Sequence, residues 1–105
     1  MDTFTALADP TRRRIIESLA LHETSFGALA ERFEMSRPAV SQHLKVLRDA
    51  GIVVSRAEGQ RRIYRLTDSG LDELDDWIKK VHSFWSQSLD RLEEVLGSHN
   101  EGEDR

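Results

Sequence analysis

The sequence predicts a mainly α-helical fold with one small β-hairpin. Apolar residues recur at helical spacing in several stretches, and only residues 52–66 have the pattern of two short strands around a glycine. The 105 residues suit one small domain, whose apolar share of 38% allows only a modest core. We therefore expect one domain over residues 1–96, with a last helix over about residues 67–96 and an acidic flexible tail over residues 97–105.

The first long helix is expected to begin after Asp9, because aspartate is a preferred N-cap and Pro10 then occupies the first helical position. Apolar residues at helical spacing predict its buried face, made of Ile15, Ile16, Leu19 and Ala20. The three arginines at residues 12–14 point in three directions around a helix, so at least one is expected in solvent. Before this helix, Phe4 and Leu7 belong to a short segment, expected to be helical, whose apolar side chains need a partner.

The next two helices are expected to follow each other closely. Ser25 is the expected N-cap of a helix from Phe26 to about Phe33. The connection over residues 34–36 is so short that the two helices must turn sharply, which is the helix-turn-helix arrangement.

The second helix of this pair begins at the N-cap Ser36 and is expected to end at Ala50, because Gly51 supplies a left-handed residue. Its apolar stripe consists of Val40, Leu44 and Leu47. The opposite face carries Pro38, Ser41, Gln42, Lys45 and Asp49. Short polar side chains beside cations can reach base edges and phosphates in a DNA major groove, whereas the alternative is a solvated helix of any small domain.

A basic hairpin is expected after this helix, with strands over residues 52–58 and 61–66 and a turn at Gly59. One face of the second strand carries Arg62, Tyr64 and Leu66, and the other carries Arg61, Ile63 and Arg65, so we expect one apolar anchor side. A basic hairpin directly after a helix-turn-helix is typical of a winged helix, where it contacts phosphates or the minor groove. The alternative is a solvated edge hairpin on which positive charge discourages aggregation.

Charge is strongly segregated along the chain, although the net charge is −4. Residues 36–66 carry +5, residues 67–105 carry −7 and residues 1–35 carry −2. A basic face toward an anionic polymer and an acidic back are therefore expected. The absence of cysteine excludes disulfides, thiolate metal sites and cysteine nucleophiles, and no apolar run approaches the roughly 18 residues of a membrane span. We expect a cytoplasmic protein with no membrane partner.

The last predicted helix has an apolar stripe at alternating spacings of three and four, with Ser88 as the one polar break. The stripe consists of Leu71, Leu74, Ile78, Val81, Trp85, Leu92 and Val95. So small a domain cannot bury it, so a second copy of the chain is the expected partner, with Phe4 and Leu7 able to close over the stripe. The less favoured alternative is a ligand pocket lined by Trp77, Phe84 and Trp85.

An enzyme is disfavoured by the sequence. The four histidines lie far apart, no catalytic serine or aspartate pattern or glycine-rich phosphate loop accompanies them, and the chain is too small for a deep pocket and a dimer face. A winged helix used only for protein contacts would need an apolar or neutral exposed face. The polar helix face and the basic hairpin do not fit that class.

Three segments resemble the ArsR/SmtB family of bacterial winged-helix transcriptional repressors. They are ALADPTRRRII at residues 6–16, FGALAERFEMSRPAVSQHLKVLRDAGIV at residues 26–53 and EGQRRIYRLTDSGLDEL at residues 58–74. The resemblance implies a homodimer, joined through its first and last helices, that binds an imperfect inverted repeat in double-stranded DNA and blocks transcription. MarR-type and PadR-type regulators are the closest alternatives, since they share the winged helix and a C-terminal dimer helix.

The resemblance also implies roles for individual residues. Arg37, Pro38, Ser41 and Gln42 are expected at base edges or flanking phosphates, and Lys45 on the backbone. The basic hairpin independently adds Arg61 and Arg62 as expected DNA contacts. The expected dimer interface consists of Phe4, Leu7, Leu71, Leu74, Ile78, Val81 and Trp85. His43 falls on the flank of the helix, where we expect a packing or hydrogen-bonding role.

The metal-sensing patterns of the family are missing. Residues 24–27 lack the cysteine pair of one family site, and His82 lacks the spaced histidine and carboxylate companions of another. Because selective binding of a transition metal needs at least three suitable ligands, we expect no metal and no cofactor. Thiol chemistry is excluded without cysteine, so the sequence assigns no inducer.

Overall fold

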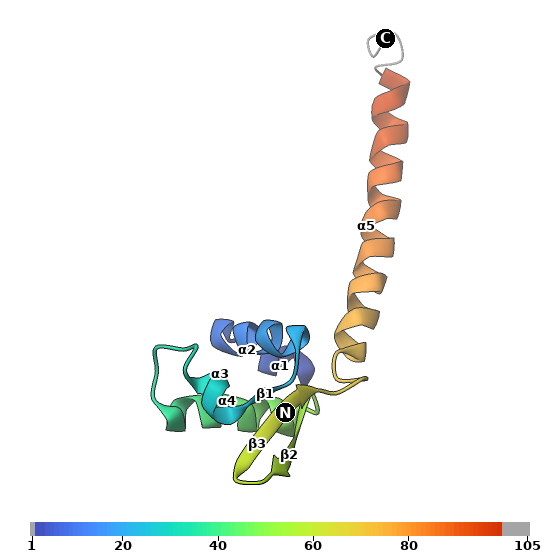
Figure 1. Ribbon diagram of the computed structural model, residues 1–105. Helices are drawn as coiled ribbons and strands as arrows, with labels where there is room; N and C mark the ends of the chain where they lie inside the picture. Colours follow the sequence, from blue (N-terminus) through green and yellow to red (C-terminus); the bar gives the residue numbers. More distant parts are fainter. Residues whose placement is uncertain (1, 100–105) are drawn as a thin grey trace. The chain divides into compact units, whose positions relative to one another are not determined.

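The computed structural model describes residues 2–99, and its contacts divide the chain into two units, residues 1–74 and residues 75–105 (Figure 1). The elements in chain order are α1 (Thr3–Leu7), α2 (Pro10–Leu21), β1 (Thr24–Ser25), α3 (Phe26–Ala30), α4 (Arg37–Asp49), β2 (Val53–Glu58), β3 (Arg61–Leu66) and α5 (Asp72–His99). The predicted tail began at Gly97, but α5 continues to His99, and residues 100–105 lie outside the described part of the chain.

Three helix starts follow from local capping. The side chains of Asp9, Ser25 and Ser36 each accept a hydrogen bond from the backbone amide three residues later, at 3.0, 3.2 and 3.2 Å. Each bond satisfies an amide that has no partner within its helix. The predicted starts of α2, α3 and α4 are therefore confirmed, as is the left-handed Gly51 after α4, with φ of 78°.

Helix α3 is shorter than predicted, since it ends at Ala30 rather than Phe33. The chain tightens after Ala30, because the amides of Arg32 and Phe33 bond to carbonyls only three residues back, at Leu29 and Ala30. Phe33 is nevertheless 8% exposed and belongs to the core.

The sheet has three antiparallel strands in the order β1-β3-β2. The hairpin of β2 and β3 turns at Gly59, with φ of 64°, as predicted. Two-residue β1 was not predicted, because so short a strand has no periodicity of its own. It pairs Thr24 with Tyr64 and Ser25 with Ile63, which makes β3 the central strand.

Burial of β3 differs from the prediction of one apolar anchor side. Ile63 and Tyr64 point to opposite faces of the strand, yet they are only 5% and 6% exposed. Of these two side chains only Tyr64 belongs to the core cluster, so the hairpin packs into the core on the face of β3 that carries Tyr64. Ile63 is covered on the opposite face, outside that cluster.

The core of the first unit is formed by the apolar faces of the helices and the start of β2. Its largest fully buried side chains are Ile15, Leu29, Leu44, Leu47, Ile52, Val40 and Val53. The prediction that Ala20 is buried is wrong, because Ala20 is exposed. It lies roughly 40° around the helix beyond Ile16, outside the arc that faces the core. On α1, Ala6 and Thr3 are buried, whereas Phe4 is 39% exposed.

The segment between β3 and α5 is not helical, so the predicted helix start at Thr67 is wrong. The Thr67 hydroxyl donates to the Gly51 carbonyl at 2.8 Å and its amide donates to the Ile52 carbonyl at 2.9 Å. These bonds hold the segment against the chain between α4 and β2. At Gly70, a Cβ atom would lie 2.8 Å from the Ile52 Cα, so the close approach requires glycine. Helix α5 begins only at Asp72.

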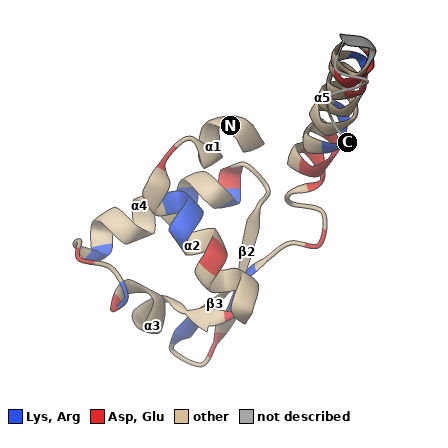
Figure 2. Ribbon diagram, turned by 90° about the horizontal axis from the view of Figure 1, so that it is seen from above, with Lys and Arg blue, Asp and Glu red and all other residues tan. Residues whose placement is uncertain are grey.

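Helix α5 carries many large apolar side chains that are exposed within one chain. The exposed fractions of Ile78, Val81 and Trp85 are 49%, 41% and 61%. Acidic residues are frequent along the same helix, as the red bands of Figure 2 show, and Lys79 pairs with Asp75 at 3.0 Å. No helix within residues 2–99 combines the length and the apolarity that crossing a membrane would need.

Candidate nucleic-acid interface

Helix α4 presents the face that its periodicity predicts. Arg37, Pro38, Ser41, Gln42 and Lys45 are all exposed. Across the helix, the apolar stripe is at most 1% exposed, because it packs into the core. The core contacts therefore fix the rotation of α4, and the polar face remains open to a ligand.

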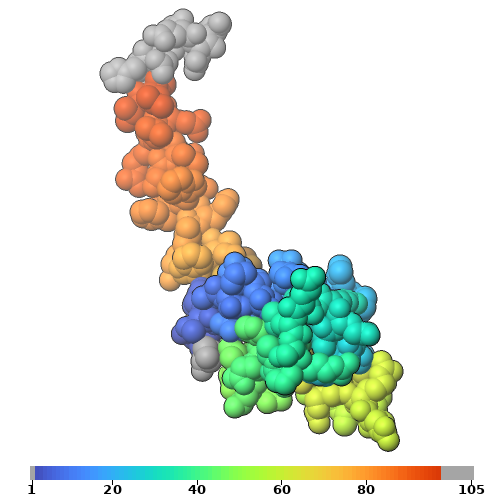
Figure 3. All heavy atoms as spheres, turned by 90° about the vertical axis from the view of Figure 1, so that its left-hand side faces the viewer, coloured from blue at the N-terminus to red at the C-terminus, as the bar shows by residue number. Residues whose placement is uncertain are grey.

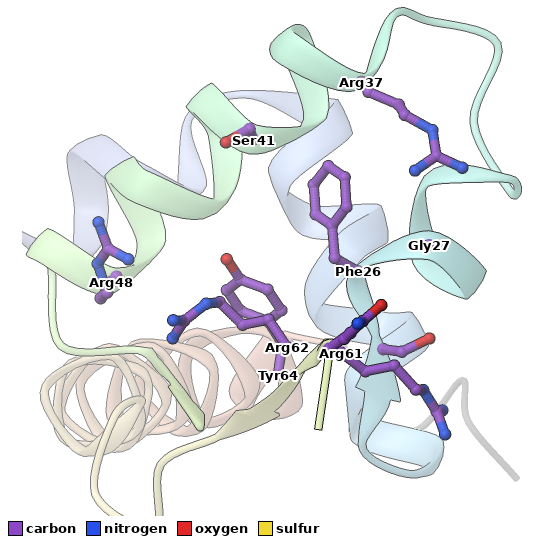
Figure 4. Close-up of a pocket in the computed structure, with 10 residues that line it drawn as sticks. Phe26, Gly27, Arg37, Ser41, Arg48, Arg61, Arg62 and Tyr64 are labelled. Carbon is purple, nitrogen blue, oxygen red and sulfur yellow. The ribbon is translucent and has the colours of Figure 1, made fainter. Parts of the chain in front are cut away.

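An open groove of about 730 Å³ lies between α4, the first turn of α3 and β3 (Figure 4). Its lining residues are Ser25, Phe26, Gly27, Arg37, Ser41, Arg48, Gln60, Arg61, Arg62 and Tyr64. Four of these are arginines and none is acidic. Because guanidinium groups match phosphate oxygens in charge and geometry, the groove is suited to a polyanion.

Two of the groove arginines are held by neighbouring side chains. The Arg37 guanidinium lies 5.9 Å from the centroid of the Phe26 ring, within the range of a cation–π contact. The Arg62 Nη1 donates a hydrogen bond of 3.1 Å to the Ser55 hydroxyl of the adjacent strand. Such contacts restrict long side chains before a ligand arrives and so reduce the entropy lost on binding.

The space-filling view shows the β2–β3 hairpin, in yellow, as a projection beside the surface of α3 and α4 (Figure 3). One cation of this hairpin, Arg56, already forms ion pairs with acidic side chains. The Arg56 guanidinium contacts Glu23 at 2.6 Å and Glu58 at 3.1 Å, and the pKa of Glu23 is lowered by its hydrogen bond to Arg56. The +5 counted over residues 36–66 therefore overstates the charge that is free to meet a polyanion.

His43 lies away from the groove, on the flank of α4. Its Nδ1 atom is 3.4 Å from Arg12 Nη1 and 3.9 Å from an Asp9 carboxylate oxygen. The expected hydrogen-bonding role of His43 is confirmed. Arg12 also donates to the Ala6 carbonyl at 2.6 Å, so helices α2, α4 and α1 meet at this side chain.

Two groove residues, Arg48 and Tyr64, were not predicted although the sequence contains a signal for each. Arg48 is two helical turns after Ser41, which places both on the same face of α4. Tyr64 is two residues after Arg62 and so shares a face of β3 with it. Phe26 and Gly27 carried no signal, because their place in the groove depends on how α3 packs against β3.

Within residues 2–99, no three His, Cys, Asp or Glu side chains are grouped so that they could hold a metal ion. The exposed face of α4 and the groove offer hydrogen bonding and charge, carried by arginine, serine, glutamine and lysine. These are the side chains that contact phosphates and base edges in complexes with DNA.

Comparison with known proteins identifies the family. The profile described as bacterial regulatory protein, arsR family, matches residues 9–55. The HTH-type transcriptional regulator Rv2034 of Mycobacterium tuberculosis is 44% identical over 99 residues, which cover 94% of this chain and 88% of that protein. The chain belongs to the arsR family of bacterial regulatory proteins.

Further similarities extend over most of this arsR-family chain. The transcriptional repressor SdpR of Bacillus subtilis is 34% identical over 73% of this chain and 86% of its own length. A crystal structure of a possible transcriptional regulator for arsenical resistance superposes with a TM-score of 0.73 at 43% identity, covering 88% of this chain and 93% of that one.

The arsR-family chain is thus a DNA-binding transcriptional regulator with a winged helix-turn-helix fold, and it is not an enzyme. Helices α3 and α4 form the helix-turn-helix, and β2 with β3 forms the wing. The alternatives of a protein-interaction module or a MarR-type or PadR-type regulator are not favoured.

Proposed function

We propose that this arsR-family chain acts as a homodimeric repressor that binds an imperfect inverted repeat in double-stranded DNA. The observation that carries the proposal is the exposed polar face of α4 beside a groove lined by four arginines and no carboxylate. In the proposed complex, each copy of α4 lies in a major groove, and the two grooves are one helical turn apart. The wing contacts the flanking backbone or minor groove.

Individual roles follow from the placement of the side chains. Arg37, Pro38, Ser41 and Gln42 face base edges or the adjacent phosphates, and Lys45 faces the backbone. Arg61 and Arg62 meet phosphates from the wing. Their exposure in the free protein supports this assignment, because each can reach DNA without unfolding α4.

The homodimer is proposed from the apolar surface of α5. Exposed aliphatic and aromatic side chains recur along the helix as far as Leu96, and a contiguous apolar surface of this length is unusual on a monomer. We propose the interface residues Phe4, Leu7, Leu71, Leu74, Ile78, Val81 and Trp85. Leu7 and Leu71 also pack partly against the core of the first unit. Trp77, Phe84 and Trp85 are half exposed or more, and we assign them to this interface rather than to a ligand pocket.

We propose repression by occupancy of a promoter, as the family resemblance implies. The name of SdpR, a transcriptional repressor, supports the direction of regulation. A bacterial DNA-binding regulator acts where the chromosome is, so we place the protein in the cytoplasm. No inducer is proposed.

The function is tested by selecting bound fragments from genomic DNA with the purified protein and titrating the recovered site at several salt concentrations. An inverted repeat bound by one dimer, with lower transcription from that promoter when protein is added in vitro, is the expected result. Weak, salt-sensitive binding without enrichment of any sequence would contradict the proposal.

A further inference from the structure

Tyr64 combines a buried ring with a hydroxyl that opens into the arginine-lined groove. The residue is 6% exposed and is part of the core, yet it also lines the groove. Figure 4 shows the ring standing on β3 with its hydroxyl directed into the groove, toward α4. Such a side chain cannot swing away, because its ring is enclosed by the strands and helices around it.

The Tyr64 hydroxyl has no hydrogen-bond partner within residues 2–99 of the free chain. Every fully buried side-chain nitrogen or oxygen among these residues does have a partner, so the hydroxyl is reached by solvent. Buried tyrosines usually direct their hydroxyl to an acceptor. Because Tyr64 lines the groove, an acceptor can reach its hydroxyl from there.

Positive charge surrounds the opening. Arg62 is beside the tyrosine ring on the same strand face, and Arg48 lies across the groove on α4. The Arg62 Nη1 atom donates to Ser55, which orients the guanidinium and leaves its other two nitrogens available. Ser41 adds a hydroxyl from α4. An acceptor bound between these groups would accept from the neutral Tyr64 hydroxyl and lie beside the guanidinium groups of Arg62 and Arg48.

We propose that Tyr64, Arg48 and Arg62 form a phosphate-binding notch, in which the Tyr64 hydroxyl donates a hydrogen bond to a phosphate oxyanion. The inference rests on the proposed function, since a phosphodiester of the DNA backbone beside α4 is the expected occupant. A free phosphate or phosphate monoester has the same chemistry and is the second source. A hydrogen bond from a neutral donor to a charged oxygen is shorter and stronger than one between neutral groups.

Tyr64→Phe tests the notch, because it keeps the buried ring and removes only the hydroxyl. We expect affinity for the selected operator and for an unrelated duplex to fall by the same factor, roughly tenfold, since a backbone contact carries no sequence information. The slope of the logarithm of affinity against the logarithm of salt concentration is expected to stay unchanged, because no charge is removed. Arg48→Ala is expected to weaken both duplexes and to reduce that slope by about one.

Arg65→Ala is the matched control, since Arg65 lies on the opposite face of β3 and donates to the Leu66 carbonyl. It is expected to leave the affinity for each of the two duplexes closer to the wild-type value than Tyr64→Phe does. Wild-type affinity in Tyr64→Phe, or a loss confined to the operator, would overturn the notch while the wild-type protein still binds its operator. Failure of the wild-type protein to bind any operator would instead overturn the proposed function.

A second measurement needs no substitution. Tyr64 is the only tyrosine of the chain, so fluorotyrosine labelling produces a single ¹⁹F resonance from this site. The resonance is expected to shift when either duplex is bound. Inorganic phosphate exchanged for chloride at matched ionic strength separates the two sources: a shift shows that the notch also takes free phosphate, and its absence assigns the notch to the DNA backbone. No shift with bound duplex would overturn the proposal.

Discussion

The Arg12 guanidinium lies 3.4 Å from the His43 ring and thereby joins the start of α2 to the middle of α4. The same side chain donates to the carbonyls of Ala6 and Thr5, at 2.6 and 3.3 Å, where α1 ends. One residue of the arginine run thus connects three helices. The orientation of α4, on which DNA contact depends, is supported by this connection as well as by the core.

Arg12→Ala is expected to destabilise the fold by about 1 to 3 kcal/mol, because the part-buried bond to the Ala6 carbonyl loses its charged donor. Urea unfolding monitored by circular dichroism measures this loss. Arg13→Ala is the matched control, since Arg13 makes one exposed bond, to the Leu7 carbonyl. The Arg13→Ala substitution should lower the free energy of unfolding by roughly 0.5 kcal/mol or less. Equal losses in the two variants would contradict the connecting role of Arg12.

Acid is expected to weaken the fold through Asp9. Its pKa lies below the usual 3.8, chiefly because the carboxylate accepts the Arg12 amide, with smaller contributions from the charges of His43 and Arg12. A lowered folded-state pKa means that the stabilisation is complete above the unfolded value and is lost as the pH falls through the folded value. Asp9→Asn keeps an N-cap acceptor but cannot titrate.

The stability difference between wild type and Asp9→Asn is therefore expected to shrink between about pH 5 and pH 2. Urea unfolding across this range measures it. Asp2 and Glu23, whose pKa values are also lowered, titrate in both proteins and cancel in the comparison. A difference that is independent of pH would show that the Asp9 charge does not contribute.

Gln42→Ala is expected to weaken operator binding by about 1 to 3 kcal/mol and to relax sequence preference, because a side-chain amide can pair with a base edge. Fluorescence anisotropy with the selected operator and with single-base variants measures both effects. Affinity for an unrelated duplex serves as the control and should hardly change. Equal losses on operator and unrelated DNA would count against direct base readout by Gln42.

Arg62→Ala is expected to weaken binding to every duplex and to reduce the salt slope by about 0.9, as removal of one phosphate contact should. Arg56→Ala is the matched control on the wing, since Arg56 is already paired with Glu23 and Glu58. It should leave the salt slope near that of the wild type. If Arg56→Ala reduced the slope as much as Arg62→Ala, the distinction between paired and free wing cations would be wrong.

Val81→Glu is expected to produce a monomer with poor operator affinity, because a charge within an apolar interface is left unpaired. Sedimentation velocity measures the oligomeric state. Ser83→Glu adds the same charge to an exposed position of α5 roughly 160° around the helix from Val81, and it should leave the oligomeric state unchanged. An unaltered assembly in Val81→Glu would show that the interface lies elsewhere.

Local interactions explain most of what could be predicted. The cap of α4 at Ser36 involves an amide three residues away, and its stripe of Val40, Leu44 and Leu47 follows from helical geometry. The wing turn at Gly59 needs only a residue that tolerates positive φ. The exposed residues of α4 were correctly predicted for the same reason, since burial of one helix face exposes the other.

The predictions that proved wrong depend on contacts between segments far apart in the chain. Helix α5 starts at Asp72 because Thr67 is bound to the chain at Gly51 and Ile52, a contact that no local pattern shows. Ala20 has the spacing of a buried residue, but the width of the face that meets the core is decided by the packing of α2.

The sequence by itself determined the order of the helices and of the two wing strands, the caps that begin α2, α3 and α4, and the polar face of α4, because these depend on neighbours within about one helical turn. Only the tertiary structure decided that β1 makes β3 a central strand, that Glu23 pairs with Arg56, and that Tyr64 of β3 and Arg48 of α4 line one groove. Those relationships join residues far apart in the chain. Their geometry is set by the packing of the core.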